Sequence, residues 1–256
     1  MSSDFSQQLW KALRDWWHER AQSQGARRAT SLLLRELWEF VRDSTPEQRR
    51  QRYGDMDYDW EQRFNTTSGG VGWRTRLLGV FHSAYQPTDP ADFSQMMAAL
   101  PIDFREFTFI DIGSGKGRTL LMASEYPFQT IVGVELMEEL HRAAQENIAC
   151  FQSRTDRANA RQTVDARQTM IDSVCMDARA FVFPETPLVV YLFNPLPEAA
   201  LRRVVQNLEQ SWRQTPRPVW VVYHNPLLDT VLASATFLEK TVGAPQYGIY
   251  RTRVSA

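Results

Sequence analysis

The pattern of hydrophobic and polar positions changes near residue 100 of the 256-residue chain. Beyond that point, short apolar runs alternate with longer amphipathic segments. The predicted strands are 107–112, 130–135, 170–176, 187–193 and 218–223, and the predicted helices are 117–125, 137–151, 197–212 and 226–234. Alternation of this kind indicates a parallel sheet with helices on both faces. The last apolar stretches flank residues 243–248 and predict a hairpin that gives the sheet an antiparallel edge.

The N-terminal part of the chain has a helical pattern instead. Apolar residues recur at three- and four-residue intervals over 4–22, which predicts an amphipathic helix. Thr30 or Ser31 is expected to cap a second helix. Six tryptophans precede residue 75 and favour an ordered helical cap over a floppy tail. We therefore expect a helical cap or lid over residues 1–84 and an α/β domain over 85–256.

Composition narrows the functional classes. A hydrophobic fraction of 43% with 23% charged residues is ordinary for a soluble protein, and the formal net charge of −1 argues against nucleic acid as a partner. The N-terminus has no secretory pattern, and no apolar stretch approaches the roughly 20 residues that span a bilayer. Cys150 and Cys175 lack metal-ligand spacing. We expect a cytoplasmic protein without a membrane segment or a bound metal.

A glycine-rich turn, FIDIGSGKGR, follows the first predicted strand at residues 109–118. A triphosphate-binding loop requires a hydroxyl residue where this chain has Gly117 and a glycine where it has Ile110. A dinucleotide fingerprint, G-x-G-x-x-G, requires a third glycine at a position that this turn does not supply. Asp111 would repel a pyrophosphate, whereas it would attract an ammonium group. The turn therefore favours a nucleoside that carries an amino-acid tail, S-adenosylmethionine.

These residues resemble the first motif of the class I S-adenosylmethionine-dependent methyltransferases, D-x-G-x-G-x-G. The motif consists of Asp111, Gly113, Ser114, Gly115 and Gly117. The resemblance covers about residues 85–225 and implies a Rossmann-like, mostly parallel seven-stranded sheet with an antiparallel C-terminal edge strand.

Two further strand ends match the family. The resemblance implies that Glu135 accepts hydrogen bonds from the ribose hydroxyls of the cofactor and that Leu136 lies beside it. It also implies that Asp177 accepts from the adenine amino group and that the Ala178 amide meets the ring. Two structural alternatives remain: Glu135 is a surface charge, or Asp177 only caps a short helix that begins at Ala178.

The fourth strand ends in Asn194-Pro195, where the family places its fourth motif, facing the methyl group. The resemblance implies a catalytic and cofactor-binding role for Asn194 and a substrate contact for Pro195. Amino-group methyltransferases often have Asn-Pro-Pro and an aromatic residue here, whereas this chain continues with Leu196-Pro197. The usual way of holding a planar nitrogen is therefore altered. Pro195 is equally well explained by a turn before the next helix.

Candidate residues for the acceptor side end the fifth strand, namely Tyr223, His224 and Asn225. For His224, both a structural hydrogen-bonding role and a role as base are open. Upstream, Tyr85 and Thr88 belong to YQPTDP, which resembles a Y-x-P-T-x-P element of some bacterial methyltransferases, including some that modify protein lysines. The implied role of Tyr85 and Thr88 is to close over the methionine end of the cofactor.

The sequence thus predicts an S-adenosylmethionine-dependent methyltransferase whose acceptor is a small molecule or a protein side chain. Two alternatives remain. One is a nucleotide-dependent oxidoreductase, and the other is a non-catalytic cofactor-binding protein on the same fold.

Overall fold

The computed structural model describes residues 10–11, 13–15, 17–18, 20–22, 25–42, 66, 88–159, 169–193 and 196–253. The chain divides into two compact units, one of residues 1–63 with 67–86 and the other of residues 64–66 with 87–256. The predicted boundary after residue 84 and the role of the N-terminal part as a lid remain predictions. None of the described helices has the length and apolar character needed to cross a bilayer.

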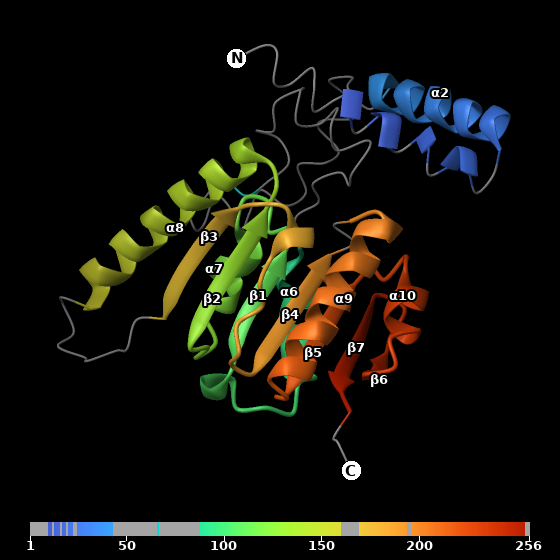
Figure 1. Ribbon diagram of the computed structural model, residues 1–256. Helices are drawn as coiled ribbons and strands as arrows, with labels where there is room; N and C mark the ends of the chain where they lie inside the picture. The colour runs from blue at the N-terminus through green and yellow to red at the C-terminus, as the bar shows by residue number, and fades with distance from the viewer. Residues whose placement is uncertain are drawn as a thin grey trace. The chain divides into compact units, whose positions relative to one another are not determined.

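The first unit contains a helical segment within residues 10–22 and helix α2 (Ala26–Arg42) (Figure 1). The helix begins directly after Gly25, whose φ of 86° is left-handed. Thr30 and Ser31 therefore lie inside the helix, and their hydroxyls donate to the carbonyls of Ala26 and Arg28 at 2.9 Å each. The prediction that one of them caps the helix was wrong, because both hydroxyls bond back to the preceding turn.

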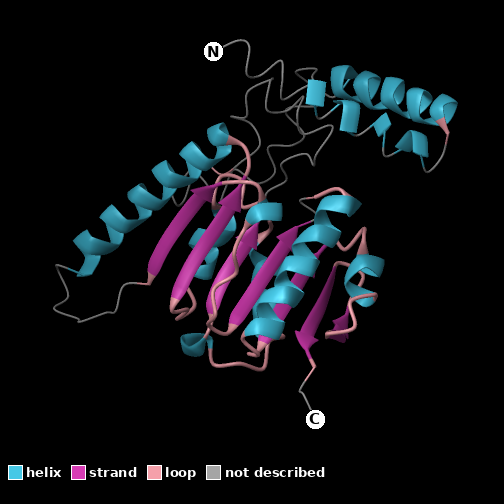
Figure 2. Ribbon diagram, in the orientation of Figure 1, coloured by secondary structure: helices cyan, strands magenta, loops and turns pink. Residues whose placement is uncertain are grey.

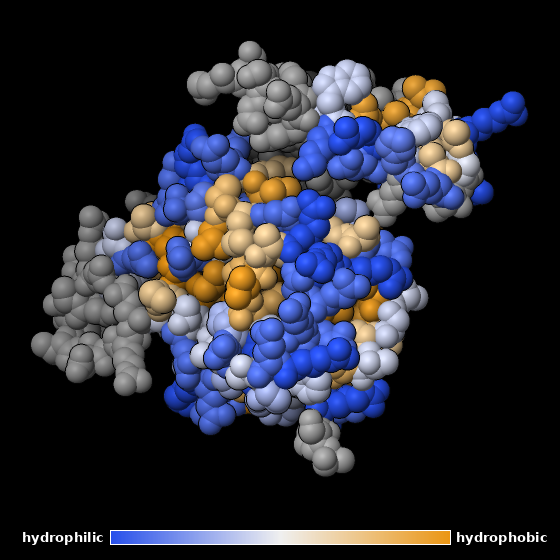
Figure 3. Space-filling view, in the orientation of Figure 1, coloured by the Kyte–Doolittle hydropathy of each residue, from blue (hydrophilic) through white to orange (hydrophobic). Residues whose placement is uncertain are grey.

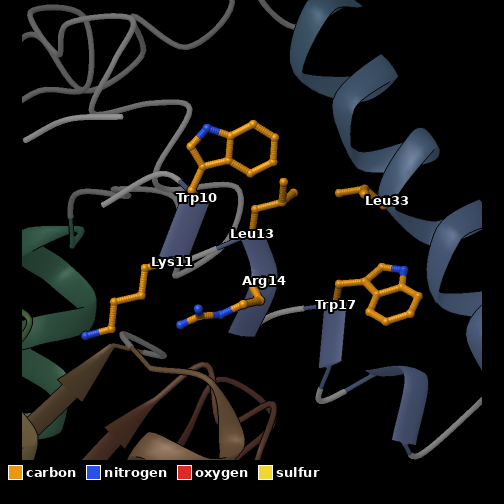
Figure 4. Close-up of a pocket in the computed structure, with 6 residues that line it drawn as sticks. All are labelled: Trp10, Lys11, Leu13, Arg14, Trp17 and Leu33. Atoms are coloured by element: carbon orange, nitrogen blue, oxygen red, sulfur yellow. The ribbon is translucent and has the colours of Figure 1, made fainter. Parts of the chain in front are cut away.

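The helices of this unit line an open, mostly apolar pocket of about 570 Å³ (Figure 4). Its lining residues are Trp10, Lys11, Leu13, Arg14, Trp17 and Leu33. The Trp17 indole donates to the Thr30 hydroxyl at 3.3 Å and so ties the first helical segment to α2. Trp10 remains 69% exposed. Trp17, one of the six N-terminal tryptophans, therefore joins the two helical segments.

The second unit is built on a seven-stranded sheet of order β3-β2-β1-β4-β5-β7-β6 (Figure 2). Its strands are β1 (Thr108–Ile112), β2 (Thr130–Glu135), β3 (Met170–Cys175), β4 (Leu188–Phe193), β5 (Val219–His224), β6 (Leu238–Gly243) and β7 (Tyr247–Thr252). The pairs among β1 to β5 are parallel, whereas β7 pairs antiparallel with β5 and β6. This sheet confirms the predicted fold class. It also places the ends of β1 and β4 side by side where the strand order reverses.

Helices cover both faces of the sheet (Figure 1). They are α6 (Pro90–Ala98), α7 (Arg118–Ala123), α8 (Glu138–Asn159), α9 (Glu198–Gln214) and α10 (Asp229–Ala233), with 3₁₀ turns η3 (Phe104–Glu106) and η4 (Ala178–Ala180). In Figure 1, α6 and α7 lie behind the sheet and α9 and α10 lie in front of it. The sequence did not predict α6. Asp89 caps it by accepting from the Ala91 amide at 2.8 Å, and Pro90 occupies its first position.

The core lies against the central strands, because β1 and β5 are buried along their whole length. On one face, Ile110, Val190 and Val221 pack in a cluster with the apolar side of α9. On the other face, Phe93 of α6 meets Phe109 and Tyr191 edge-on, with ring centroids 6.0 and 5.7 Å apart. Aromatic contacts therefore fix α6 against β1 and β4.

The surface over β2 and β3 is apolar in part (Figure 3). Two large apolar side chains in or next to these strands are exposed, namely Leu136 (51%) and Met170 (63%), and Val182 after η4 is 84% exposed. Leu136 directly follows β2 and so belongs to the carboxyl edge of the sheet, where the predicted site residues lie.

Candidate functional site

The turn between β1 and α7 depends on three glycines with left-handed backbones. The φ angles of Gly113, Gly115 and Gly117 are 79°, 54° and 79°. Side chains other than glycine are strained in this region. The amides of Gly113 and Ser114 donate to the Val134 carbonyl at 2.8 and 3.2 Å, which holds the turn against β2. The conformation of this turn therefore requires glycine at these three positions at the end of β1.

A fourth glycine, in β2, makes this close contact possible. A Cβ atom at Gly133 would lie 2.6 Å from the Ser114 Oγ and 2.7 Å from the Leu120 Cδ1. The Ser114 Oγ is buried and has no hydrogen-bond partner among the described residues. Sequence reasoning missed Gly133, because a single glycine within an apolar strand pattern does not show what lies across from it. Its signal was the glycine itself, which often marks a close backbone approach.

Asp111 is buried at the end of β1, with 2% exposure. Its carboxylate accepts a hydrogen bond from the Thr119 hydroxyl. The pKa of Asp111 is raised from 3.8 to about 7, mainly by burial and also by the nearby Glu135, while the Thr119 hydrogen bond opposes the increase. A cation bound beside Asp111 would favour the ionised carboxylate and would gain from its charge.

Glu135 ends β2 and is 7% exposed, so it is not a surface charge. Its Oε2 accepts from the Gly115 amide and its Oε1 from the Met137 amide, both at 2.8 Å. Burial raises the pKa of Glu135, and the backbone hydrogen bonds oppose this increase. A carboxylate has about four lone-pair sites, so these two bonds leave capacity for hydroxyl donors. The ribose role itself remains a prediction.

Asp177 precedes η4 and caps it, as the structural alternative predicted. Its Oδ1 accepts from the Arg179 amide at 2.9 Å, and its Oδ2 pairs with the Arg179 Nη2 at 2.6 Å. Sequence reasoning did not identify Arg179 as this partner. Ala178 is 7% exposed. The adenine contacts of Asp177 and Ala178 remain predictions, because capping leaves carboxylate lone pairs available.

The predicted acceptor residues at the end of β5 are described by the structure. Tyr223 is fully buried, and its hydroxyl accepts from the Leu228 amide at 3.3 Å. Asn225 has a left-handed φ of 47°, and its amide donates to the Gln246 carbonyl at 2.6 Å. Their roles toward an acceptor remain predictions. Tyr85, Asn194 and Pro195 lie outside the described residues.

A buried polar chain joins Thr88, Tyr191 and His224. The Tyr191 Oη lies 2.9 Å from the Thr88 Oγ1 and 2.8 Å from the His224 Nδ1. Phe193 stacks on the His224 ring with a centroid distance of 4.1 Å. Sequence reasoning singled out Thr88 and His224 separately. It did not connect them through Tyr191, since the three residues come from distant parts of the chain.

The strand order, the glycine turn after β1 and the acidic residue at the end of β2 are those of the Rossmann-like fold of the class I methyltransferases. Residues 81–211 match the model of the family described as Histone methylation protein DOT1. The chain belongs to this family.

Solved structures with a similar fold include three methyltransferases at low identity. One is a ribosomal protein L11 methylase from Lactobacillus delbrueckii subsp. bulgaricus, with 16% identity, 64% of this chain and 78% of that chain covered, and a TM-score of 0.42. Another is an RNA methyltransferase from Salinibacter ruber in complex with S-adenosyl-L-homocysteine, with 18% identity, 65% of this chain and 92% of that chain covered, and a TM-score of 0.42. The third is the putative methyltransferase yhhF from Escherichia coli, with 14% identity, 66% of this chain and 87% of that chain covered, and a TM-score of 0.44. Curated proteins include no significant match to the sequence.

Proposed function

We propose that this chain binds S-adenosylmethionine at the carboxyl edge of β1 and β2 and transfers its methyl group to a protein side-chain nitrogen. One observation carries the proposal: a buried carboxylate, Asp111, stands before a glycine turn with a left-handed backbone, and this turn is held against a second buried carboxylate, Glu135. The family assignment supports methyl transfer as the reaction.

The residues of the site fit the chemical parts of this cofactor. Asp111 suits the ammonium group, because a buried carboxylate gains most from a nearby cation. The remaining lone pairs of Glu135 suit the ribose hydroxyls. Leu136, half exposed beside Glu135, offers an apolar contact for the adenine ring. A dinucleotide would place phosphate charge beside the two carboxylates and fits this site less well.

When bound, S-adenosylmethionine supplies an electrophilic methyl group on a positively charged sulfonium, with a neutral thioether as the leaving group. The protein's task is to orient the acceptor and to exclude water. Correct orientation alone contributes on the order of 7–11 kcal/mol to lowering such a barrier. The acceptor nitrogen must arrive unprotonated, so that its lone pair is available for the attack. We assign the contact with the acceptor to Asn194, Pro195, Tyr223 and Asn225.

Two features support a protein amine as the acceptor. The family is described by its methylation of histones, which are proteins. In addition, Asp89 and Asp92 lie close enough to His224 to act on its pKa, and Asp92 keeps 37% of its side chain exposed. Carboxylates at this edge attract a cationic side chain to the site. Nucleic acid is a less suitable partner, since the chain carries a formal charge of −1.

Calorimetry with S-adenosylmethionine, S-adenosylhomocysteine and NAD tests the cofactor, and we expect binding of the first two only. Binding of NAD alone would support an oxidoreductase instead. Transfer of a labelled methyl group to a cell extract, resolved by mass, then tests the reaction, and we expect label in the protein fraction. Label confined to small molecules would overturn the protein acceptor. Cofactor binding without any transfer would indicate a non-catalytic protein.

A substitution of Asn194 separates catalysis from cofactor binding. Asn194→Ala should reduce methyl transfer more than it reduces cofactor affinity, because Asn194 is assigned to the acceptor side. Asp172→Asn is a matched control, since Asp172 is an exposed side chain on β3. Equal losses of transfer and affinity in Asn194→Ala would place Asn194 with the cofactor instead.

A further inference from the structure

Thr88, Tyr191 and His224 form a chain of hydrogen bonds, and each of these bonds has a direction from donor to acceptor. Tyr191 has one hydroxyl hydrogen and lies within bonding distance of both partners. It can donate to only one of them and must accept from the other. The state of the His224 ring therefore determines which way the hydrogens point along the chain.

The surroundings of His224 select one direction. Its Nε2 faces the Oδ2 of Asp92 at 3.9 Å. A carboxylate accepts hydrogen and donates none, so it favours the hydrogen of the neutral ring on Nε2. The Nδ1 then accepts from the Tyr191 hydroxyl, and the Tyr191 oxygen accepts from the Thr88 hydroxyl. In this arrangement Thr88 has used its only hydrogen and presents lone pairs to any other partner.

Protonation of His224 reverses the chain. A doubly protonated ring donates from Nδ1 to the Tyr191 oxygen, so the Tyr191 hydrogen must turn toward Thr88. The Thr88 oxygen then accepts from Tyr191, and its own hydrogen is released toward a new partner. Within this chain only the hydrogens move, and the one added proton resides on His224.

Thr88 shares a neighbour, Tyr191, with the carboxylate that we assign to the ammonium group. Tyr191 is the register partner of Asp111 in the neighbouring strand, and Thr88 bonds to Tyr191. Thr88 and Asp111 are therefore both neighbours of Tyr191. An ammonium group held at Asp111 needs acceptors around it, and a Thr88 oxygen with free lone pairs is one.

We infer that Tyr191 and His224 are positioning residues that set the hydrogen-bond polarity of Thr88 toward the ammonium end of the cofactor. With neutral His224, Thr88 accepts from the ammonium group. With protonated His224, Thr88 offers a competing donor and the cofactor binds more weakly. This inference rests on the proposed function, because it takes the ammonium group to be the partner of Thr88.

The groups around His224 come from three elements and from the residue before one of them. Tyr191 lies on β4, Asp92 on α6 and Asp89 directly before α6, and Tyr247 of β7 is its register partner. Burial lowers the pKa of His224 below its ordinary value, while Asp92 and Asp89 oppose this decrease. The switch therefore operates below pH 6.5, and His224 is neutral at neutral pH.

The direction of the chain is tested without any ligand. Nitrogen-15 NMR of the imidazole side chains reports which ring nitrogen of His224 carries the hydrogen. We expect the hydrogen on Nε2 at pH 7.5, and we expect Tyr191→Phe to change the Nδ1 signal because it removes the donor. A hydrogen on Nδ1 in the native protein would overturn the inference, even if the cofactor binds as proposed.

The effect on the ligand is tested by proton release. Calorimetry of S-adenosylhomocysteine binding at pH 5.5–6.5, in buffers of different ionisation enthalpy, counts the protons released. The wild type should release more protons than His224→Asn, which keeps an acceptor near the Nδ1 position and does not titrate. His141→Asn is the matched control and should release as many protons as the wild type, because His141 bonds to Ser173 beneath α8.

Affinity at pH 7.5 completes the test. His224→Asn should stay within about threefold of the wild type, whereas Tyr191→Phe should bind about 3- to 10-fold more weakly, the scale of one hydrogen bond. Equal proton release by wild type and His224→Asn would overturn the inference. Failure of the wild type to bind S-adenosylhomocysteine would refute the proposed function, and with it the role of Thr88, whereas the NMR result would still decide the direction of the chain.

Discussion

Replacing Asp111 by Asn should make the ligand-free protein more stable at neutral and alkaline pH. The folded-state pKa of Asp111 is about 7, against 3.8 as its ordinary value, because the carboxyl is buried. Ionisation of this group in the folded protein is therefore unfavourable. Asparagine keeps the size of the side chain and an oxygen that accepts from the Thr119 hydroxyl, but it carries no charge.

The magnitude follows from the shift of the pKa. The folded protein binds more protons than the unfolded chain between pH 3.8 and about 7, so the stability contributed by this group falls as the pH rises through that range. The full shift of about three pKa units corresponds to roughly 4 kcal/mol, at about 1.4 kcal/mol per unit. By the same relation, the gain from Asp111→Asn should be about 2 kcal/mol at pH 5 and roughly 4 kcal/mol at pH 8.

Urea unfolding at pH 5 and pH 8 measures this difference as a change in the midpoint and in the free energy of unfolding. Asp172→Asn serves as the control, because Asp172 is exposed and its substitution should have little effect at either pH. A gain from Asp111→Asn that is the same at both pH values would refute the reasoning. So would a loss of stability at pH 8, since either result would mean that the Asp111 carboxyl ionises without cost.

The ionised fraction of the Asp111 carboxyl grows with pH, so the affinity of the His224→Asn variant for S-adenosylhomocysteine should rise by about 15-fold from pH 5.5 to pH 7. Adding Asp111→Asn to this variant should remove the rise. Isothermal titration measures both, and an unchanged pH profile would contradict the ammonium contact. Glu135→Ala should weaken cofactor binding by about 1–3 kcal/mol, and unchanged affinity would argue against its ribose role. Gly133→Ala should destabilise the fold by about 1–3 kcal/mol, because its Cβ would lie 2.6 Å from the Ser114 Oγ. Thermal melts measure this loss, and Gly243→Ala, whose Cβ would lie 3.4 Å from its nearest described neighbour, should change stability little.

The strands and most helices of the second unit were predicted from the sequence, because the central strands β1, β4 and β5 are buried apolar runs. Thus β1 was expected at 107–112 and lies at Thr108–Ile112. The start of α2 was not predicted, since the helix begins after the left-handed Gly25 rather than at a hydroxyl cap. Helix α6 was missed because its start, Asp89-Pro90, lies in a proline-rich stretch that resembles a loop, although the same pair also begins helices.

The candidate site was predictable where one residue type is needed at a fixed place in a local motif. The glycines after β1 and the acids that end β1 and β2 belong to this class. Contacts between distant segments were not predictable in the same way. The sequence shows neither that Gly133 faces Ser114 nor that Tyr191 joins Thr88 to His224, because strand pairing and helix packing bring these residues together.

The two buried carboxylates differ in their partners, and this difference gives the site a polarity. Glu135 accepts from two backbone amides that the fold holds in place, so part of its charge is already balanced in the ligand-free protein. Among the described residues, Asp111 accepts from the Thr119 hydroxyl, and its pKa rises to about 7. A neutral hydroxyl balances a charge less well than charge-assisted amide bonds do. The unbalanced charge therefore lies at the end of β1, and a ligand with one cationic and one hydroxyl-bearing end should bind with its cation at Asp111 and its hydroxyls at Glu135.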